Sequence, residues 1–262
     1  MDTPMVFKLN CLTDLHMGSG EVNYSVIDLE VQRDTVTGEP TMHSSGVKGA
    51  LRDYCEAKAA DDDEKQLVVK IFGSDQNGDQ PGTYRFLSAD LLARPVRISA
   101  GSGAYVLATT PDLIRLFLNK LSAFGLRDLF PDSPLPERLD PTILCSDRSV
   151  KKVEGFRVEY ADCPLLDSIL GTKSWALMPS GFLSAIDLPV RAHNVLNEKG
   201  ISKNLWYEQN VPHESVFGLL ILAPDGGKAL GRFLSDGAIV QFGANASTGG
   251  GLIRMERVDK NG

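Results

Sequence analysis

The chain has 262 residues, of which 42% are hydrophobic and 23% charged, a balance typical of a globular protein rather than a disordered one. Its length suits one large domain. No apolar run reaches the ~20 residues of a membrane-spanning helix, and the N-terminal residues lack a signal-peptide pattern. The four cysteines stand far apart without a Cys-x-x-Cys spacing, which is typical of reduced thiols. We therefore expect a cytoplasmic protein with no membrane partner.

The formal net charge is −7, which argues against indiscriminate binding of nucleic acid. The charge is unevenly distributed, however. Residues 59–80 and 131–170 carry an acidic surplus, whereas residues 84–116 and 228–262 carry a basic one. The overall sign of the charge therefore does not decide which partner the protein binds.

The first third of the chain alternates between extended and helical patterns. In order, we expect a half-buried strand at 5–13, a loop at 16–21, a partly extended segment at 26–34, a turn at 37–40, a helix at 47–60 and a short helix at 61–72. Ser44 or Ser45 can cap the first helix, because a serine hydroxyl accepts a hydrogen bond from an N–H that would otherwise be unpaired.

The rest of the chain is less regular. We expect strands at 84–91 and 104–108, a helix from Thr110 to Phe124, strands at 205–207 and 215–222, a helix at 226–235 and final strands at 238–242 and 251–258. A glycine-rich loop at 243–250 separates the last two strands. Residues 125–180 read as an irregular insertion. The order of elements predicts an α+β fold with a ferredoxin-like pattern.

Two segments have the composition of anion-binding sites. The serines before the first helix are followed by Lys48 and Arg52, and a helix N-terminus with nearby cations suits a phosphate. Thr248, Gly249 and Gly250 allow a ligand to approach the backbone closely. The alternatives are a simple helix cap and a flexible hairpin connection. Neither segment has the spacing of a Walker-type nucleotide site.

Two further residues are candidates for chemistry. His16 follows a predicted strand beside Gly18, where it could act as a general base or contact a phosphate, or simply be solvated. Asp28 and Asp34 could share one side of their segment, or could be ordinary turn carboxylates. The remaining histidines have no spacing for a zinc site or a catalytic triad.

In combination these motifs are more specific than any one of them. LHMGSGE at residues 15–21 is followed by IDLEVQRD at 27–34, GEP at 38–40 and SSGVKGALRD at 44–53. In this order they resemble the N-terminal signature of the RAMP proteins of type III CRISPR effectors. Within that family, PVR at 95–97, ATTPDL at 108–113 and LWYEQNVP at 205–212 are similar to blocks of the repeated backbone subunit of the type III-B (Cmr) complex.

The resemblance implies a single domain over residues 1–262, with a modified ferredoxin-like (RRM-type) palm, helical insertions and a β-hairpin thumb at about 190–205. It also implies copies stacked along a CRISPR guide RNA together with other Cmr subunits. On that model the guide contacts side chains or backbone at His16, Ser44, Ser45, Lys48, Arg52, Arg191, Thr248, Gly249 and Gly250.

The resemblance further implies an endoribonuclease that cuts complementary target RNA with Mg²⁺ or Mn²⁺. The corresponding aspartate is Asp28, which would hold the metal or assist deprotonation of a ribose 2′-OH. Two alternatives stay open. The chain could be a scaffold that binds RNA without cutting it, or an endonuclease that processes guide RNA with His16 as general base.

Overall fold

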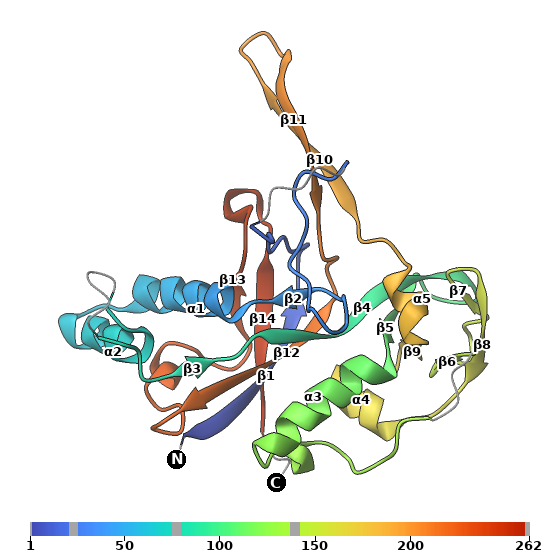
Figure 1. The fold of residues 1–262 in the computed structure, drawn as a ribbon, viewed down its shortest axis with the longest axis horizontal. Helices are drawn as coiled ribbons and strands as arrows, with labels where there is room; N and C mark the ends of the chain where they lie inside the picture. The colour runs from blue at the N-terminus through green and yellow to red at the C-terminus, as the bar shows by residue number, and fades with distance from the viewer. Residues whose placement is uncertain (1, 21–25, 75–79, 137–141, 260–262) are drawn as a thin grey trace.

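The computed structural model describes residues 2–20, 26–74, 80–136 and 142–259 (Figure 1). Its helices are α1 (Ser44–Lys58), α2 (Asp62–Phe72), α3 (Pro111–Ala123), α4 (Pro164–Leu170) and α5 (Ser180–Ser184). Its main strands are β1 (Thr3–Cys11), β4 (Ala89–Ala100), β5 (Tyr105–Thr109), β10 (Val190–Leu196), β11 (Ser202–Gln209), β12 (Val216–Ala223), β13 (Ala238–Gln241) and β14 (Leu252–Val258). Shorter strands are β2 (Thr41–Met42), β3 (Arg85–Phe86), β6 (Ile143–Cys145), β7 (Lys152–Val153), β8 (Phe156–Tyr160) and β9 (Trp175–Leu177).

One large mixed sheet organises the molecule, in the order β13-β14-β1-β12-β4-β5-β9-β6-β8-β7. The central strand β12 is buried along its whole length, which explains its unbroken apolar sequence VFGLLILA. A strand covered on both faces has no side that must be polar. Antiparallel pairing joins β12 to β1 over eight registered positions, from Thr3 opposite Ala223 to Asn10 opposite Val216.

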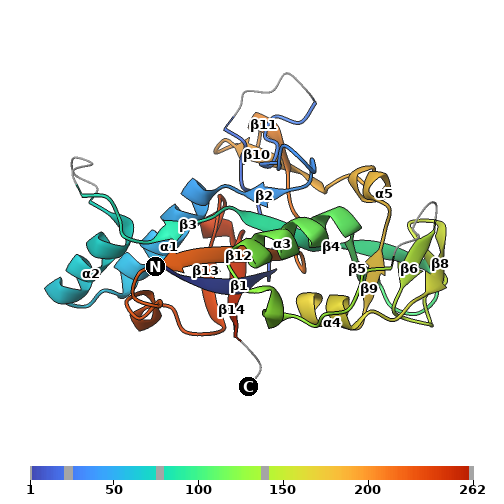
Figure 2. The ribbon, with the colours of Figure 1, turned by 60° about the horizontal axis from the view of Figure 1, so that its bottom comes forward.

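The helices divide between the two faces of this sheet. Val47, Leu51 and Cys55 of α1 share a hydrophobic cluster with Phe217 and Leu219 of β12. A second cluster joins α3 and α4 to the other β12 face, through residues that include Phe117, Leu166 and Leu220. In both views α1 and α2 lie at one end of the long axis, and the small strands β6–β9 lie at the other (Figures 1 and 2).

Strands β10 and β11 form a separate two-stranded antiparallel sheet. This thumb hairpin projects away from the body of the protein, meaning the described residues outside it (Figure 1). It extends past the expected end at residue 205 to Gln209, because Tyr207, Glu208 and Gln209 continue the pairing with Val190–Ala192. Several of its apolar side chains are exposed, among them Leu205 at 52%.

Most of the helices predicted from sequence are present, with small shifts at their ends. Asp61 caps α2 by accepting the amide of Glu64, and Thr110 caps α3 by accepting the amide of Leu113. Residues 125–180, expected to be irregular, contain β6–β9, α4 and a short 3₁₀ turn, with 137–141 outside the described residues. Among the described residues, no helix is long and apolar enough to cross a membrane.

Three predicted features are wrong. His43, not Ser44 or Ser45, is the N-cap of α1, because β2 brings the chain in an extended conformation up to His43. Residues 226–235 form turns and one 3₁₀ turn rather than a helix. Gly226 and Gly227 both have positive φ there, and the Asp225 carboxylate binds the amides of Gly227 and Ala229. The strand predicted at 84–91 is broken between β3 and β4.

The glycine-rich loop is held by contacts that only glycine allows. Gly251 has φ +70°, and a Cβ placed on it would lie 1.9 Å from the carbonyl oxygen of Phe242. Gly249 has a similar φ of +79°, yet a Cβ there would meet nothing within 4 Å. The two positions therefore separate the cost of a left-handed backbone from the cost of a steric clash.

We expect Gly249→Ala to lower the free energy of unfolding by roughly 1 kcal/mol, the cost of a left-handed conformation for a residue with a Cβ. Gly251→Ala adds the clash with the Phe242 carbonyl, so its loss should reach roughly 3 kcal/mol. Urea unfolding followed by circular dichroism measures both values. Equal losses in the two variants would show that the backbone near Phe242 relaxes freely.

Candidate functional site

Three segments distant in sequence meet on one face of the body. The His16 loop (residues 14–19) lies against the glycine-rich loop, since the amide of Ala244 donates to the His16 carbonyl at 3.0 Å and the amide of Gly251 donates to the Asp14 carbonyl at 2.9 Å. A Cβ on Gly243 would lie 2.2 Å from the His16 carbonyl oxygen. The two loops thus pack backbone against backbone.

Met17 joins this pair of loops to the start of α1. A Cβ on Gly46 would lie 2.6 Å from the Met17 methyl carbon, and one on Gly243 would lie 3.0 Å from the Met17 sulfur. The first turn of α1, the His16 loop and the glycine-rich loop therefore form one continuous surface, which we call the loop face. Ser44, Ser45, Thr248 and Gly249 are exposed on it, and Lys48 is half-buried.

Arg52 also lies on α1, but its guanidinium is already paired. Its Nε is 2.7 Å from the Glu56 carboxylate one turn later. The first turn of α1 contains no acidic residue, so the helix itself places no negative charge where an anion would bind.

His16 is 4% exposed, and its Nδ1 lies 2.7 Å from the carbonyl oxygen of Gln209. The solvated loop histidine considered from sequence is therefore wrong. The ring instead connects the loop face to the end of β11. The Glu208 carboxylate lies 3.9 Å from the same nitrogen.

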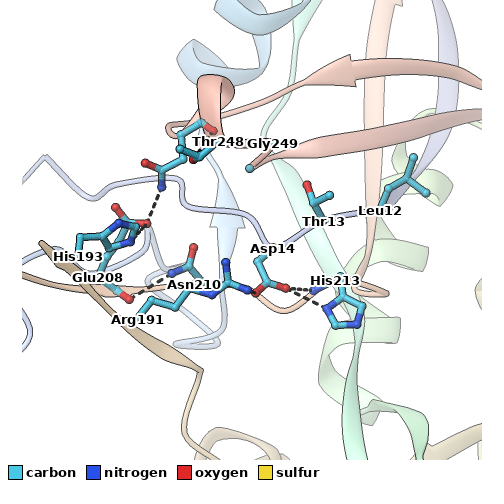
Figure 3. A pocket seen from close by; sticks show the side chains of 12 residues that line it. Leu12, Thr13, Asp14, Arg191, His193, Glu208, Asn210, His213, Thr248 and Gly249 are labelled. Carbon is cyan, nitrogen blue, oxygen red and sulfur yellow. Dashed lines mark hydrogen bonds and ion pairs between the residues drawn. The ribbon is translucent and has the colours of Figure 1, made fainter.

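A cavity of about 420 Å³ lies where the thumb hairpin leaves the body (Figure 3). We call this place the thumb root. The cavity lies between β10 and β11 on one side and Thr248–Gly250 on the other. Glu208 is 3% exposed and accepts the Asn245 side-chain amide at 2.7 Å, which ties β11 to the glycine-rich loop. His193 stacks on Trp206, with ring centroids 5.3 Å apart.

Asp14 and His213 also line the cavity (Figure 3). The Asp14 carboxylate pairs with the Arg191 guanidinium and accepts both the amide of His213, at 2.8 Å, and the His213 ring Nδ1, at 3.0 Å. Burial alone would raise the pKa of Asp14, but the hydrogen bonds from His213 and the charge of Arg191 outweigh it and lower this pKa. The carboxylate is therefore ionised at neutral pH.

Asp28 is exposed, and its position depends on the thumb hairpin. Its Oδ2 accepts the amide of Tyr207 at 2.8 Å, and the amides of Asp28 and Leu29 both donate to the Tyr207 carbonyl at 3.1 Å. The segment thus lies beside β11 as a short parallel bridge. Asp34, the other candidate, closes a turn by accepting the amides of Val36 and Thr37. Glu21 lies outside the described residues.

No group of three or more His, Cys, Asp or Glu side chains that could hold a metal occurs among the described residues. Sequence reasoning singled out Asp28 and Arg191 but missed Asp14, Glu208 and Asn245. Asp14 directly precedes the LHMGSGE motif, and Glu208 lies in the LWYEQNVP block. Their positions in or beside recognised motifs were the available signal, but the partners lie far away in sequence, 199 positions for Asp14 with His213 and 37 for Glu208 with Asn245.

Comparison with known proteins places this arrangement in a family. A family model described as the RAMP superfamily matches residues 8–254. The Cmr endoribonuclease Cmr4 of Pyrococcus furiosus is 27% identical over 97% of this chain and 96% of its own length. The CMR subunit Cmr4 of Saccharolobus solfataricus is 31% identical over 63% of this chain and 57% of its own.

Solved structures agree on the fold. A chain of the type III-B Cmr-beta complex bound to cognate target RNA superposes with a TM-score of 0.78 at 22% identity, covering 97% of both chains. Oligomeric Cmr4 from Pyrococcus furiosus superposes at 0.73 with 20% identity, covering 98% of both. The fold is thus the sheet-rich mixed α/β fold of these proteins. Since the family model spans almost the whole described sheet, the chain belongs to the RAMP superfamily.

Proposed function

We propose that the chain is a backbone subunit of a type III-B CRISPR ribonucleoprotein that oligomerises along guide RNA and cuts complementary target RNA. Its partners on this proposal are the guide RNA, the target RNA, other copies of the chain and the other Cmr subunits, in the cytoplasm. Support comes from the Pyrococcus furiosus Cmr4 endoribonuclease, which aligns with 97% of this chain.

The observation that carries the proposal is the geometry of Asp28. Its carboxylate is exposed to a ligand, yet one oxygen is held by the Tyr207 amide at the thumb root. Its other oxygen has no hydrogen-bond partner among the described residues. A carboxylate that is fixed in direction but open on one side suits chemistry on an RNA strand that passes the thumb hairpin.

The loop face suits the guide RNA. The N-terminal turn of α1 and Lys48 place N–H groups and a cation on this surface, beside the exposed residues Thr248 and Gly249. Arg191 adds a second cation at the thumb root, 61% exposed despite its pairing with Asp14. These contacts are local, so a net charge of −7 is compatible with them.

The residues present fit a metal site whose ligands come partly from the protein and partly from the RNA, rather than one formed by the protein alone. Asp28 has no neighbouring carboxylate cluster among the described residues. Mg²⁺ is usually held by one or two carboxylates together with substrate phosphates and water. Asp28 would thus hold Mg²⁺ or Mn²⁺ jointly with RNA, and the ion would polarise the scissile phosphate. Without a direct metal bond, the same carboxylate could accept the proton of a ribose 2′-OH.

The ferredoxin-like palm belongs to the same proposal. Its support is the antiparallel order β14-β1-β12-β4, with α1 connecting β1 to β4 and the turn segment 224–237 connecting β12 to β13 and β14. A β-α-β-β-α-β unit gives this arrangement when its second helix is reduced to turns.

We expect Asp28→Ala and Asp28→Asn to assemble with guide RNA and to bind target RNA, but to cut it at least 100-fold more slowly. Asparagine keeps an oxygen acceptor for the Tyr207 amide but lacks the negative charge. Asp236→Asn is the matched control, because Asp236 is also exposed and accepts one strand amide, that of Arg257, at 2.8 Å. Gel analysis of target cleavage by reconstituted complexes, with Mg²⁺ or with EDTA, gives the rates.

Wild-type cutting by both Asp28 variants would favour the scaffold alternative, in which the chain binds RNA without cutting it. Cutting by the asparagine variant alone would mean that Asp28 acts only through its hydrogen bond to Tyr207. Full activity in EDTA would show that cleavage does not require a divalent metal ion.

Lys48→Ala should weaken guide binding and reduce the slope of log affinity against log salt by about 0.7, the value for one phosphate contact on a single strand. Lys65→Ala is the control, since Lys65 lies on α2 and pairs with Asp62 at 3.1 Å. Filter binding of guide RNA across a salt series measures both slopes. An unchanged slope for Lys48→Ala would show that Lys48 of α1 does not contact a phosphate of the guide RNA.

The guide-processing alternative predicts cleavage of precursor guide RNA by the isolated protein without metal. We expect no such cleavage, because the His16 ring is almost fully buried and its Nδ1 is hydrogen-bonded. Incubation with precursor RNA in EDTA, comparing wild type with His16→Ala and with the exposed control His43→Ala, provides the test. Cleavage lost only in His16→Ala would support the alternative.

A further inference from the structure

The thumb hairpin is not part of the large sheet. Its two strands form a ladder only with each other, and β11 adds one parallel bridge near its end, between Glu208 and Leu29. A two-stranded ribbon on its own is marginally stable in water. The direction in which the hairpin points must therefore be set at the thumb root.

The two strands are anchored differently at that root. After β11 the backbone itself is tied down, because Val211 and Leu15 exchange two hydrogen bonds, at 2.9 and 2.8 Å. Near the start of β10, the anchor is a side-chain contact, the pair between Arg191 and Asp14.

Asp14 is well placed to serve as the fixed half of this pair. Its carbonyl accepts the amide of Gly251, and the neighbouring Thr13 hydroxyl accepts the amide of Leu252, so its loop is bound to β14. Its side chain is 11% exposed, and His213 supplies two further contacts to the carboxylate. A charge-assisted hydrogen bond is stronger than a neutral one, and the fixed position of Asp14 offsets part of the screening that the 61% exposure of Arg191 brings.

Asp28 lies outside the hairpin but is hydrogen-bonded to it. The Asp28 side chain and the amides of Asp28 and Leu29 bind Tyr207, and the amide of Gln209 binds the Leu29 carbonyl at 2.9 Å. A change in the angle of the thumb hairpin would therefore move the Asp28 carboxylate with it. The path from Asp14 to Asp28 runs through Arg191, its registered partner Glu208 and the adjacent Tyr207.

We propose that Asp14 is a positioning residue, which holds Arg191 and thereby fixes the thumb hairpin and the Asp28 carboxylate relative to the RNA. The proposal rests on the proposed function for its effect on cutting. Its effect on the protein alone does not depend on that function.

The first experiment uses hydrogen exchange of the isolated protein, read by mass spectrometry. In Asp14→Ala, the amides of Asp28, Leu29 and Tyr207 should exchange about tenfold faster than in wild type, because their local opening becomes easier. Asp259→Ala is the matched control, since Asp259 pairs with Arg257 at 2.9 Å near the carboxyl end of β14. Unchanged exchange at Asp28 and Leu29 would overturn the proposal.

The second experiment uses the reconstituted complex with guide and target RNA. Asp14→Ala should keep target binding but cut more slowly and at neighbouring phosphodiesters as well, which broadens the product lengths on a sequencing gel. Asp14→Asn, which retains an acceptor for the His213 amide, should partly restore single cuts. A slower rate with unchanged product lengths would count against positioning.

Arg191→Ala completes the test and covers the case in which Asp14→Ala fails to fold, because Arg191 is mostly exposed. It should reproduce both effects of Asp14→Ala, and the double variant should be no worse than either.

If Arg191 served chiefly as a phosphate ligand, Arg191→Ala would weaken guide binding while Asp14→Ala strengthened it, with exchange at Asp28 unchanged. That pattern would overturn the proposal. A wild-type complex that does not cut would reject the proposed function and leave the exchange result standing.

Discussion

The attachment of the thumb hairpin at its root is the constraint on which the rest of the candidate site depends. The hairpin lies outside the large sheet, and its contacts with the body are the bridge between Glu208 and Leu29 and a few polar contacts near its root. Glu208 binds Asn245 of the glycine-rich loop, and Arg191 binds Asp14 of the His16 loop. Because both contacts end on the loop face, that surface and the hairpin are positioned together.

The large sheet provides the rigid support for these contacts. Its central strands are covered by helices on both faces, and they end at the loops that form the loop face. Close packing of backbone at Gly243 and Gly251 leaves these loops little freedom. An exposed, projecting hairpin thus stands on a closely packed base, which suits a site that must be held in a defined geometry.

The positive charge at the candidate site comes from a few individual residues and not from the net charge of the chain, which is negative. The acidic runs at 59–80 and 131–170 lie outside the first turn of α1, and that turn contains no acidic residue. Arg191 is partly neutralised by Asp14, which limits how tightly a single copy can hold RNA. Weak contacts repeated along an oligomer give strong binding to a long strand, whereas a short nonspecific RNA gains little from them.

The sequence by itself determined the elements whose signals are local: the apolar β12, the helices α2 and α3, and the glycine-rich loop before β14. Its ordered motifs also indicated the family and singled out Asp28. The tertiary structure alone decided that His16 is buried, that His43 occupies the N-cap position of α1, and that Asp28 lies against the thumb hairpin. These features depend on pairs such as Asp14 with His213, which are 199 positions apart. A local pattern cannot encode such contacts, because they exist only once the sheet has brought its two ends together.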